Sequence, residues 1–135
     1  MQTKPFLGLD DACRILAAAR QEALANGWAV AIAVVDDGGH LLALERLDGC
    51  APIGAAIAGE KARTAALGRR ESRVYEEMIN AGRPAFLSAP VLQGMLEGGV
   101  PVAVDGQVVG AIGVSGVKPE QDSQIARAGA AAALD

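Results

Sequence analysis

The spacing of apolar residues near the start of the chain predicts a helix. Apolar side chains recur every three or four positions from Leu9 to Ala23, as they do along one face of a helix. Asp10 or Asp11 can cap the first turn, and Asn26-Gly27 is a typical stop. Cys13 falls within the apolar stripe, so we expect it to be buried and unreactive.

Two apolar runs on either side of a glycine-containing turn predict a first hairpin. Residues 28–35 are almost continuously apolar and form a run too short for a typical helix, which favours a central strand. The sequence Asp36-Asp37-Gly38-Gly39 then reverses the chain. Residues 40–47 return as the second strand.

Proline and alanine patterns predict the remaining helices. Pro52 suits a first helical turn, and an alanine-rich stretch continues from it to Gly68. Residues 71–80 predict another helix, and Pro119 begins a last one that reaches Leu134. Residues 83–96 contain two prolines, so we expect irregular backbone there, with a short turn or strand near Leu92.

A second hairpin is predicted over residues 98–116. Asp105-Gly106 stands between two runs rich in β-branched residues and favours a type I′ turn. Gly110, Gly113 and Gly116 weaken a strand, and such glycines usually mark a bulge or the close approach of backbone or a ligand. We therefore expect this ribbon at the centre of the sheet, with something lying close against it.

The order of these elements predicts an α/β (α+β) fold in which helices cover an antiparallel sheet. Nothing resembling a linker or repeat divides residues 1–135, so we expect one domain. The chain is 51% hydrophobic, which excludes disorder, but only 3% aromatic. A core built from small side chains gains from burial between subunits, which favours a homo-oligomer.

Charge and composition argue against several classes of partner. The net charge is −4 and no basic stripe is interleaved with aromatic residues, so a nucleic-acid partner is not expected. No run approaches the roughly 20 apolar residues of a membrane span, and no leader peptide is evident, so we expect no membrane partner and a cytoplasmic location. Cys13 and Cys50 lack the spacing of metal ligands, so we expect no metal site.

Four motifs, in order along nearly the whole chain, resemble the GlcG/HbpS family, also known as the haem-degrading or PduO C-terminal-like domain. They are residues 33–41, residues 46–49, residues 61–65 and residues 98–122. The resemblance implies a profilin-like, three-layer α/β/α fold with a five-stranded antiparallel sheet, and homo-oligomers that are commonly octamers. It also implies haem binding in some members and, in the GlcG branch, a link to glycolate metabolism.

Lys61 and Thr64 form the strongest candidate binding cluster, because they share a helical face in an alanine-rich segment. Lys61 can meet a ligand carboxylate, with Thr64 donating a second hydrogen bond. Alternatively, Lys61 pairs with Asp36 or Asp122, because a buried lysine needs a partner. Arg63, between the two, is either part of this cluster or solvated.

His40 is the only histidine and can ligate haem iron, act as an acid or base, or simply open a strand. Gly99 and Pro101 either admit a flat ligand or form a tight entry into a strand. Asp122 is either a pocket carboxylate or a first-turn charge that satisfies free N–H groups. Ser115 has no Gly-x-Ser-x-Gly elbow, which argues against a serine hydrolase.

These observations give one set of candidate ligand-binding residues and three hypotheses of function. The set is Lys61, Thr64, His40, Asp36, Gly99, Pro101, Ser115 and Asp122. The first hypothesis is an oligomeric protein that binds a small carboxylate or haem between the Lys61 helix and the glycine-rich ribbon. The second is a lyase or isomerase of small aromatic or hydroxy acids, resembling hydroxylaminobenzoate lyases. The third is an interaction protein with no small-molecule site.

Overall fold

The computed structural model describes residues 1–134, which hold four α-helices, two 3-10 helices and four strands. In chain order the elements are α1 Leu9–Ala25, β1 Ala31–Asp36, β2 Leu41–Arg46, α2 Ile53–Gly68, α3 Arg73–Asn80, η1 Pro84–Ser88, β3 Gly99–Val104, β4 Gln107–Ser115, α4 Pro119–Ala131 and η2 Ala132–Leu134. The predicted sequence of helix, hairpin, helices, hairpin and helix is confirmed.

The four strands form one antiparallel sheet in the order β2-β1-β4-β3. The second hairpin is therefore only half central, because β4 lies inside the sheet and β3 lies at its edge. Its turn is as predicted: Asp105 and Gly106 both have positive φ, at 52° and 76°. Such a turn suits the right-handed twist of the two strands that it joins.

The sheet has four strands within residues 1–134, not the five that the resemblance implied. Over residues 83–96 we expected irregular backbone with a short turn or strand near Leu92, and the structure shows the 3-10 helix η1, a turn at Pro90 and Val91, and irregular backbone after it. Val91 has a φ of 61°, which no extended strand contains. Pro90, just before it, has no N–H to donate to a neighbouring strand. Local backbone chemistry thus prevents a strand here.

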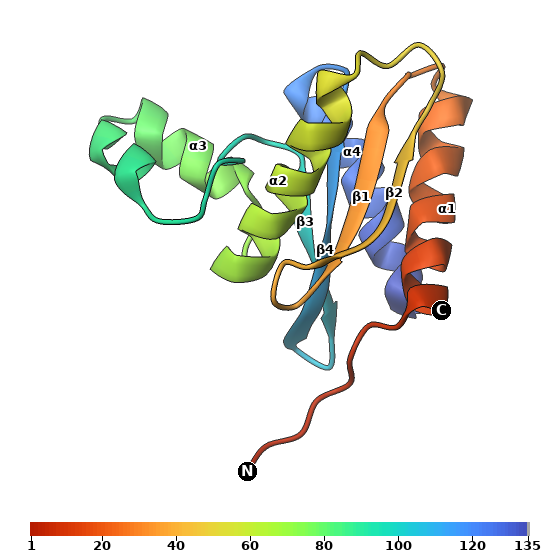
Figure 1. Cartoon of the computed structure of the whole chain (residues 1–135), viewed down its shortest axis with the longest axis horizontal. Coiled ribbons are helices and arrows are strands. Elements are labelled where there is room, and N and C mark those ends of the chain that lie inside the picture. The colour runs from red at the N-terminus through yellow and green to blue at the C-terminus, as the bar shows by residue number, and fades with distance from the viewer. Residues whose placement is uncertain (135) are drawn as a thin grey trace.

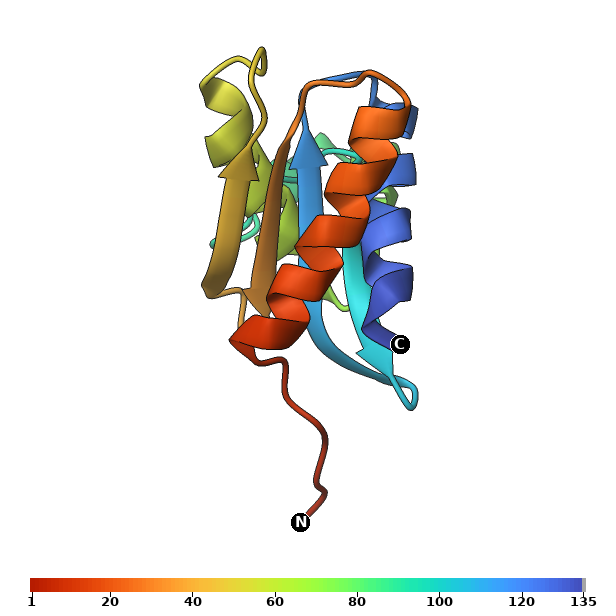
Figure 2. The same cartoon turned by 90° about the vertical axis from the view of Figure 1, so that its right-hand side faces the viewer.

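Helices cover both faces of the sheet, giving three layers (Figures 1 and 2). Helices α1 and α4 lie side by side on one face, and α2 crosses the other. The core beneath α1 and α4 contains valine, leucine and isoleucine, whereas the core beneath α2 is built mostly from alanine. The small side chains under α2 allow its backbone to approach the sheet closely.

Two glycines of the second hairpin lie directly against the backbone of α2. A Cβ atom on Gly113 would overlap the backbone oxygen of Ala58, and one on Gly99 would overlap that of Lys61. The sequence left open whether backbone or a ligand lies against these glycines. In the structure it is the backbone of α2. Helix α2 therefore faces the ribbon as predicted, but in direct contact and not across an open space.

The prediction of a buried Cys13 is wrong, because the thiol is exposed. The buried face of α1 consists of Ala12, Ile15, Leu16, Ala19 and Ala23. Cys13 lies about 100° around the helix from Ala12 and so falls outside that face. The true stripe runs through Ile15, which the sequence pattern had not included.

An arm formed by α3 and η1 projects from the body of the protein (Figure 1). Tyr75 of α3 stacks on Phe86 of η1 with ring centroids 5.2 Å apart. The Arg70 guanidinium lies over the Tyr75 ring, 5.7 Å from its centre. Stacking of the two rings thus joins α3 to η1, and the Arg70 cation adds a contact from outside the arm.

Candidate functional site

Lys61, the main sequence-predicted binding residue, lies inside the protein. Its side chain is 5% exposed, its Nζ donates to the Val114 carbonyl oxygen at 2.9 Å, and the same atom lies 3.1 Å from Asp122 Oδ2. Of the partners considered from the sequence, Asp122 is the one that the structure shows. The ammonium group is already engaged, so meeting a ligand would require this pair to open.

Asp122 lies in the first turn of α4 and holds the start of that helix to the rest of the fold. Its Oδ1 accepts a hydrogen bond from the Val117 N–H at 3.2 Å, while Oδ2 faces Lys61. Burial raises the pKa of the Asp122 carboxyl, Lys61 and the Val117 N–H oppose that shift, and Glu97 adds to it. The carboxyl thus acts within the interior and not at an open surface.

Four other predicted residues lie on α2, β3 and β4, and all of them except the half-buried Pro101 are buried. Gly99 donates its N–H to Ser72 Oγ at 2.8 Å, and Pro101 pairs with Ala111 on edge strand β3. Ser115 is buried at the end of β4, and Thr64 is fully buried in α2. No hydrogen-bond partner of Thr64 Oγ1 occurs among the described residues.

Asp36 and His40 form a second, separate group at the turn between β1 and β2. Asp36 Oδ1 accepts the backbone N–H groups of Gly38 and His40, both at 2.9 Å, and lies 3.1 Å from His40 Nδ1. Because a carboxylate accepts from an N–H, the neutral imidazole carries its proton on Nδ1. The lone pair of Nε2 is then available, and the ring is 81% exposed.

This turn forms one wall of a hollow of about 360 Å³, which we call the α2 cleft. The opposite wall is formed by residues of α2. Polar side chains of His40, Glu60 and Arg63 line it together with the apolar side chains of Val35, Leu41 and Ala55. Of the eight predicted site residues, only His40 lines this cleft. The cleft brings together an imidazole, a carboxylate and a guanidinium over an apolar floor, as ligand sites commonly do.

Glu60 and Arg63 line the cleft, although neither is among the eight candidate residues chosen from the sequence. Glu60 Oε2 is buried and has no hydrogen-bond partner among residues 1–134. No ion pair of Arg63 is found in the same part of the chain. Charged residues in the middle of an alanine-rich helix were the sequence signal for these two residues. Helical spacing alone did not show that they would face the His40 turn.

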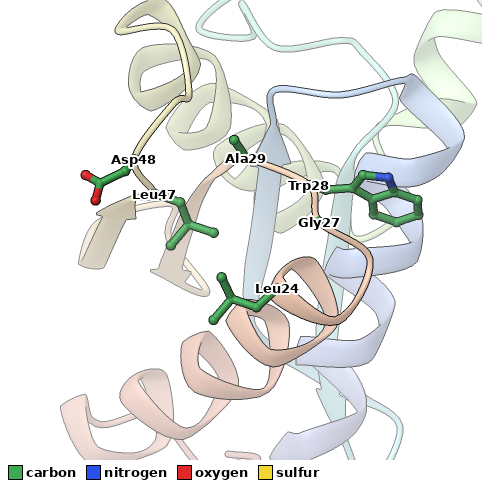
Figure 3. A pocket seen from close by; sticks show the side chains of 6 residues that line it. All are labelled: Leu24, Gly27, Trp28, Ala29, Leu47 and Asp48. Carbon is green, nitrogen blue, oxygen red and sulfur yellow. The ribbon is translucent and has the colours of Figure 1, made fainter.

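A second hollow of similar volume, about 360 Å³, lies at the other end of β1 (Figure 3). Leu24, Ala29 and Leu47 line it, with Asp48 as its one charged residue. The Trp28 indole points away from these side chains, towards α4 (Figure 3). Without converging polar groups it offers less chemistry than the α2 cleft, which we therefore take as the candidate site.

No helix among the described residues is both long and apolar enough to cross a membrane. Within residues 1–134, no three histidine, cysteine, aspartate or glutamate side chains are grouped so that they could hold a metal ion. The candidate site is thus a cleft with three polar side chains.

Comparisons with known proteins place these features in context. A family model described as "Haem degrading protein HbpS-like" matches residues 7–131. Protein GlcG of Escherichia coli (strain K12) is 64% identical over 115 residues, which cover 85% of each chain. The structure of Streptomyces reticuli HbpS, solved as a double mutant, is similar with a TM-score of 0.88 and 34% identity, covering 97% of this chain and 89% of that one. A PduOC:haem complex is similar with a TM-score of 0.84 and 26% identity, covering 95% of both.

Proposed function

This chain belongs to the HbpS-like family, and from its geometry we propose that the α2 cleft binds a small molecule that carries carboxylate groups. The observation that supports this most is the position of Arg63, which has no ion-pair partner within residues 1–134, in the same cleft as the His40 imidazole and over an apolar floor. Arg63 would donate to the ligand carboxylate, since a guanidinium matches a carboxylate in two-pronged geometry. Haem and small organic acids both carry such groups.

The residues of the cleft fit a haem-type ligand. His40 Nε2 is free to ligate iron while Asp36 fixes the ring through Nδ1, the arrangement in which imidazoles usually bind metals. Arg63 would meet a propionate, and Val35 and Leu41 would contact the macrocycle. When bound, haem would supply iron chemistry. A relative in the comparison is itself described as a haem complex, which supports this form of the proposal.

A small organic acid is the second kind of ligand that we propose, and the size of the cleft favours it over haem. A hollow of about 360 Å³ encloses a small acid, whereas a macrocycle would extend out of it. A link to glycolate metabolism, which the family resemblance implied, would go with this second kind of ligand. Both kinds of ligand would bind Arg63 through a carboxylate, so the same variants test both.

Titration of the purified protein tests the proposal. Haem binding is followed by absorption spectroscopy, and glycolate and acetate binding by calorimetry, with the wild type, Arg63→Gln and His40→Ala. We expect Arg63→Gln to weaken both ligand classes by about tenfold, as loss of a charged hydrogen bond does. His40→Ala should weaken haem alone and shift its absorption bands. Arg83→Gln, on the exposed arm, is the matched control and should change neither. Absence of saturable binding of all three ligands by the wild type would refute the proposal.

We further propose that the arm takes part in self-association. The arm and the irregular segment that follows it expose Leu87 at 63%, Val91 at 59% and Leu96 at 43%, an unfavourable surface for an isolated molecule. Burial of these side chains between copies would add the apolar area that an alanine-rich core lacks. Light scattering of the wild type and of Leu87→Lys should show a smaller particle for the variant, and identical masses would contradict this role.

A further inference from the structure

Arg69 joins the two walls of the α2 cleft. It directly follows the last residue of α2, and its Nη1 donates to the Asp37 carbonyl oxygen at 2.5 Å and to the Ala66 carbonyl oxygen at 2.8 Å. Asp37 lies in the turn that carries His40, whereas Ala66 belongs to α2, the helix that carries Arg63. One side chain therefore ties the His40 wall to the Arg63 wall, beside the C-terminal end of α2 (Figure 1).

A second contact joins the walls at the same end of the cleft. A Cβ atom on Gly39 would lie only 2.9 Å from Arg63 Cγ and 3.6 Å from Leu67 Cγ, so the turn rests directly on α2 at this point. Ala55 also lines the cleft and precedes Arg63 by eight residues, about 12 Å along the helix axis. The turn thus meets α2 near Arg69, and the cleft extends away from that contact. Loosening the contact would change the distance between the two walls.

The backbone of Arg69 is unusual for an arginine. Its φ of 57° and ψ of 32° are left-handed. Glycine is the residue that such a position at the end of a helix favours, because a Cβ atom makes the left-handed conformation costly. A non-glycine residue held in this conformation is a reason to look for a role of its side chain. The two hydrogen bonds that join the walls are such a role.

We infer that Arg69 is a positioning residue, which fixes the spacing between His40 and Arg63 before a ligand binds. This inference rests on the proposed function, that the cleft binds carboxylates. Holding two binding groups in place in advance reduces the entropy that is lost on binding. The benefit goes to ligands that contact both walls. Haem is such a ligand, through His40 and through a propionate at Arg63, whereas acetate is small enough to meet Arg63 alone.

Arg69→Gly and Arg69→Ala test the inference, because both remove the hydrogen bonds but only glycine relieves the left-handed backbone. Arg69→Gly should therefore melt at a higher temperature than Arg69→Ala. We expect both variants to bind haem about fivefold more weakly than the wild type, the size of a hydrogen bond that is partly exposed to water. Both should bind acetate within about twofold of the wild type. Arg69→Lys brings a single nitrogen with three donors towards the same two oxygens, so its haem affinity should lie between those of the wild type and Arg69→Ala.

Absorption spectroscopy follows haem binding, calorimetry follows acetate binding, and thermal denaturation gives the melting temperatures. Arg83→Ala removes an exposed guanidinium from the base of η1 and is the matched control, which should bind both ligands as the wild type does. If Arg69 served stability alone, haem affinity would follow the melting temperature, and Arg69→Gly would bind haem more tightly than Arg69→Ala. That result would overturn the inference, as would wild-type haem affinity in both variants or an equal loss of acetate affinity. Absence of saturable haem and acetate binding by the wild type would instead count against the proposed function, and this inference would fall with it.

Discussion

The Lys61 ammonium group lies 3.1 Å from the Asp122 carboxylate, and their side chains are only 5% and 4% exposed. Removing the two partners should have unequal effects. Lys61→Met leaves a buried carboxylate without its cation and should lower the free energy of unfolding by about 3–5 kcal/mol. Asp122→Asn has a single side-chain oxygen, so it can accept from Lys61 or from the Val117 N–H but not from both, and its NH2 group then faces the other donor. Lys61 keeps the Val114 carbonyl oxygen, so we expect a smaller loss of about 1–3 kcal/mol. Urea denaturation measures both, with Lys118→Met as an exposed lysine control. Equal losses in the two variants would contradict this interpretation.

The raised pKa of Asp122 predicts an unusual pH dependence. Burial is the main cause, so the folded state holds the proton at pH values where the unfolded chain, with its ordinary pKa of 3.8, has released it. The folded state then binds more protons, and stability falls as pH rises from below 3.8 through the raised pKa. Most paired carboxylates show the opposite slope. We expect the wild type to lose stability relative to Asp122→Asn over this window in urea denaturation between pH 3 and 7. A difference that is constant or rises with pH would exclude a raised pKa.

Gly113 of β4 lies directly against the backbone of α2, and adding one methyl group there should be severely destabilising. The new Cβ would overlap backbone atoms of Ala58 and Ala62, which cannot rotate away as a side chain can. We expect Gly113→Ala to lower the free energy of unfolding by about 3 kcal/mol or more. Gly59→Ala, in α2 with open space around it, should instead raise it by about 0.5–1 kcal/mol through helix propensity. Similar effects of the two changes in thermal denaturation would show that α2 can shift away from the sheet.

The fold was predictable where local patterns decide it. Asp105-Gly106 specified a turn, and the apolar run of residues 28–35 specified an interior strand, because each signal depends on neighbours in the sequence. The edge position of β3 and the exposure of Cys13 depend on which elements pack together, which local periodicity does not contain. The absent fifth strand reflects the left-handed backbone at Val91, for which a β-branched residue gives no warning.

The candidate site was less predictable for the same reason. A charged lysine in an alanine-rich helix predicted a special role, and the Asp122 alternative was among the partners considered. The sequence does not show which face of α2 packs against the sheet. Lys61 faces the sheet, whereas Glu60 and Arg63 line the cleft, because successive residues of a helix point about 100° apart. Assigning the helix face requires the tertiary packing.

Asp36 should control both the β1–β2 turn and the ligand affinity of His40. Its Oδ1 is shared by the N–H groups of Gly38 and His40 and by the imidazole Nδ1. Asp36→Ala removes all three contacts, so we expect haem affinity to fall by about tenfold, as it does when a histidine loses its orienting partner. Asp36→Asn keeps a neutral acceptor, so its haem affinity should lie between those of the wild type and Asp36→Ala. Asp37→Ala is the control, because that carboxylate pairs with Lys4 instead. Spectroscopic titration with haem distinguishes these outcomes, and unchanged affinity in Asp36→Ala would remove the positioning role.

Ser72 ties the base of the arm to the start of β3, and its hydroxyl should contribute to stability out of proportion to its size. The residue is fully buried, its Oγ donates to the Leu96 carbonyl oxygen at 2.5 Å, and the same oxygen accepts the Gly99 N–H at 2.8 Å. Ser72→Ala leaves that N–H without its acceptor in the interior, so we expect a loss of about 1–3 kcal/mol in the free energy of unfolding. Ser88→Ala removes an exposed hydroxyl that bonds within η1 and should change stability by about 0.5 kcal/mol or less. Hydrogen exchange localises the effect: the Gly99 amide should exchange faster in Ser72→Ala even under conditions where global unfolding is rare. An unchanged Gly99 rate with a lowered global stability would show that the serine acts by packing alone.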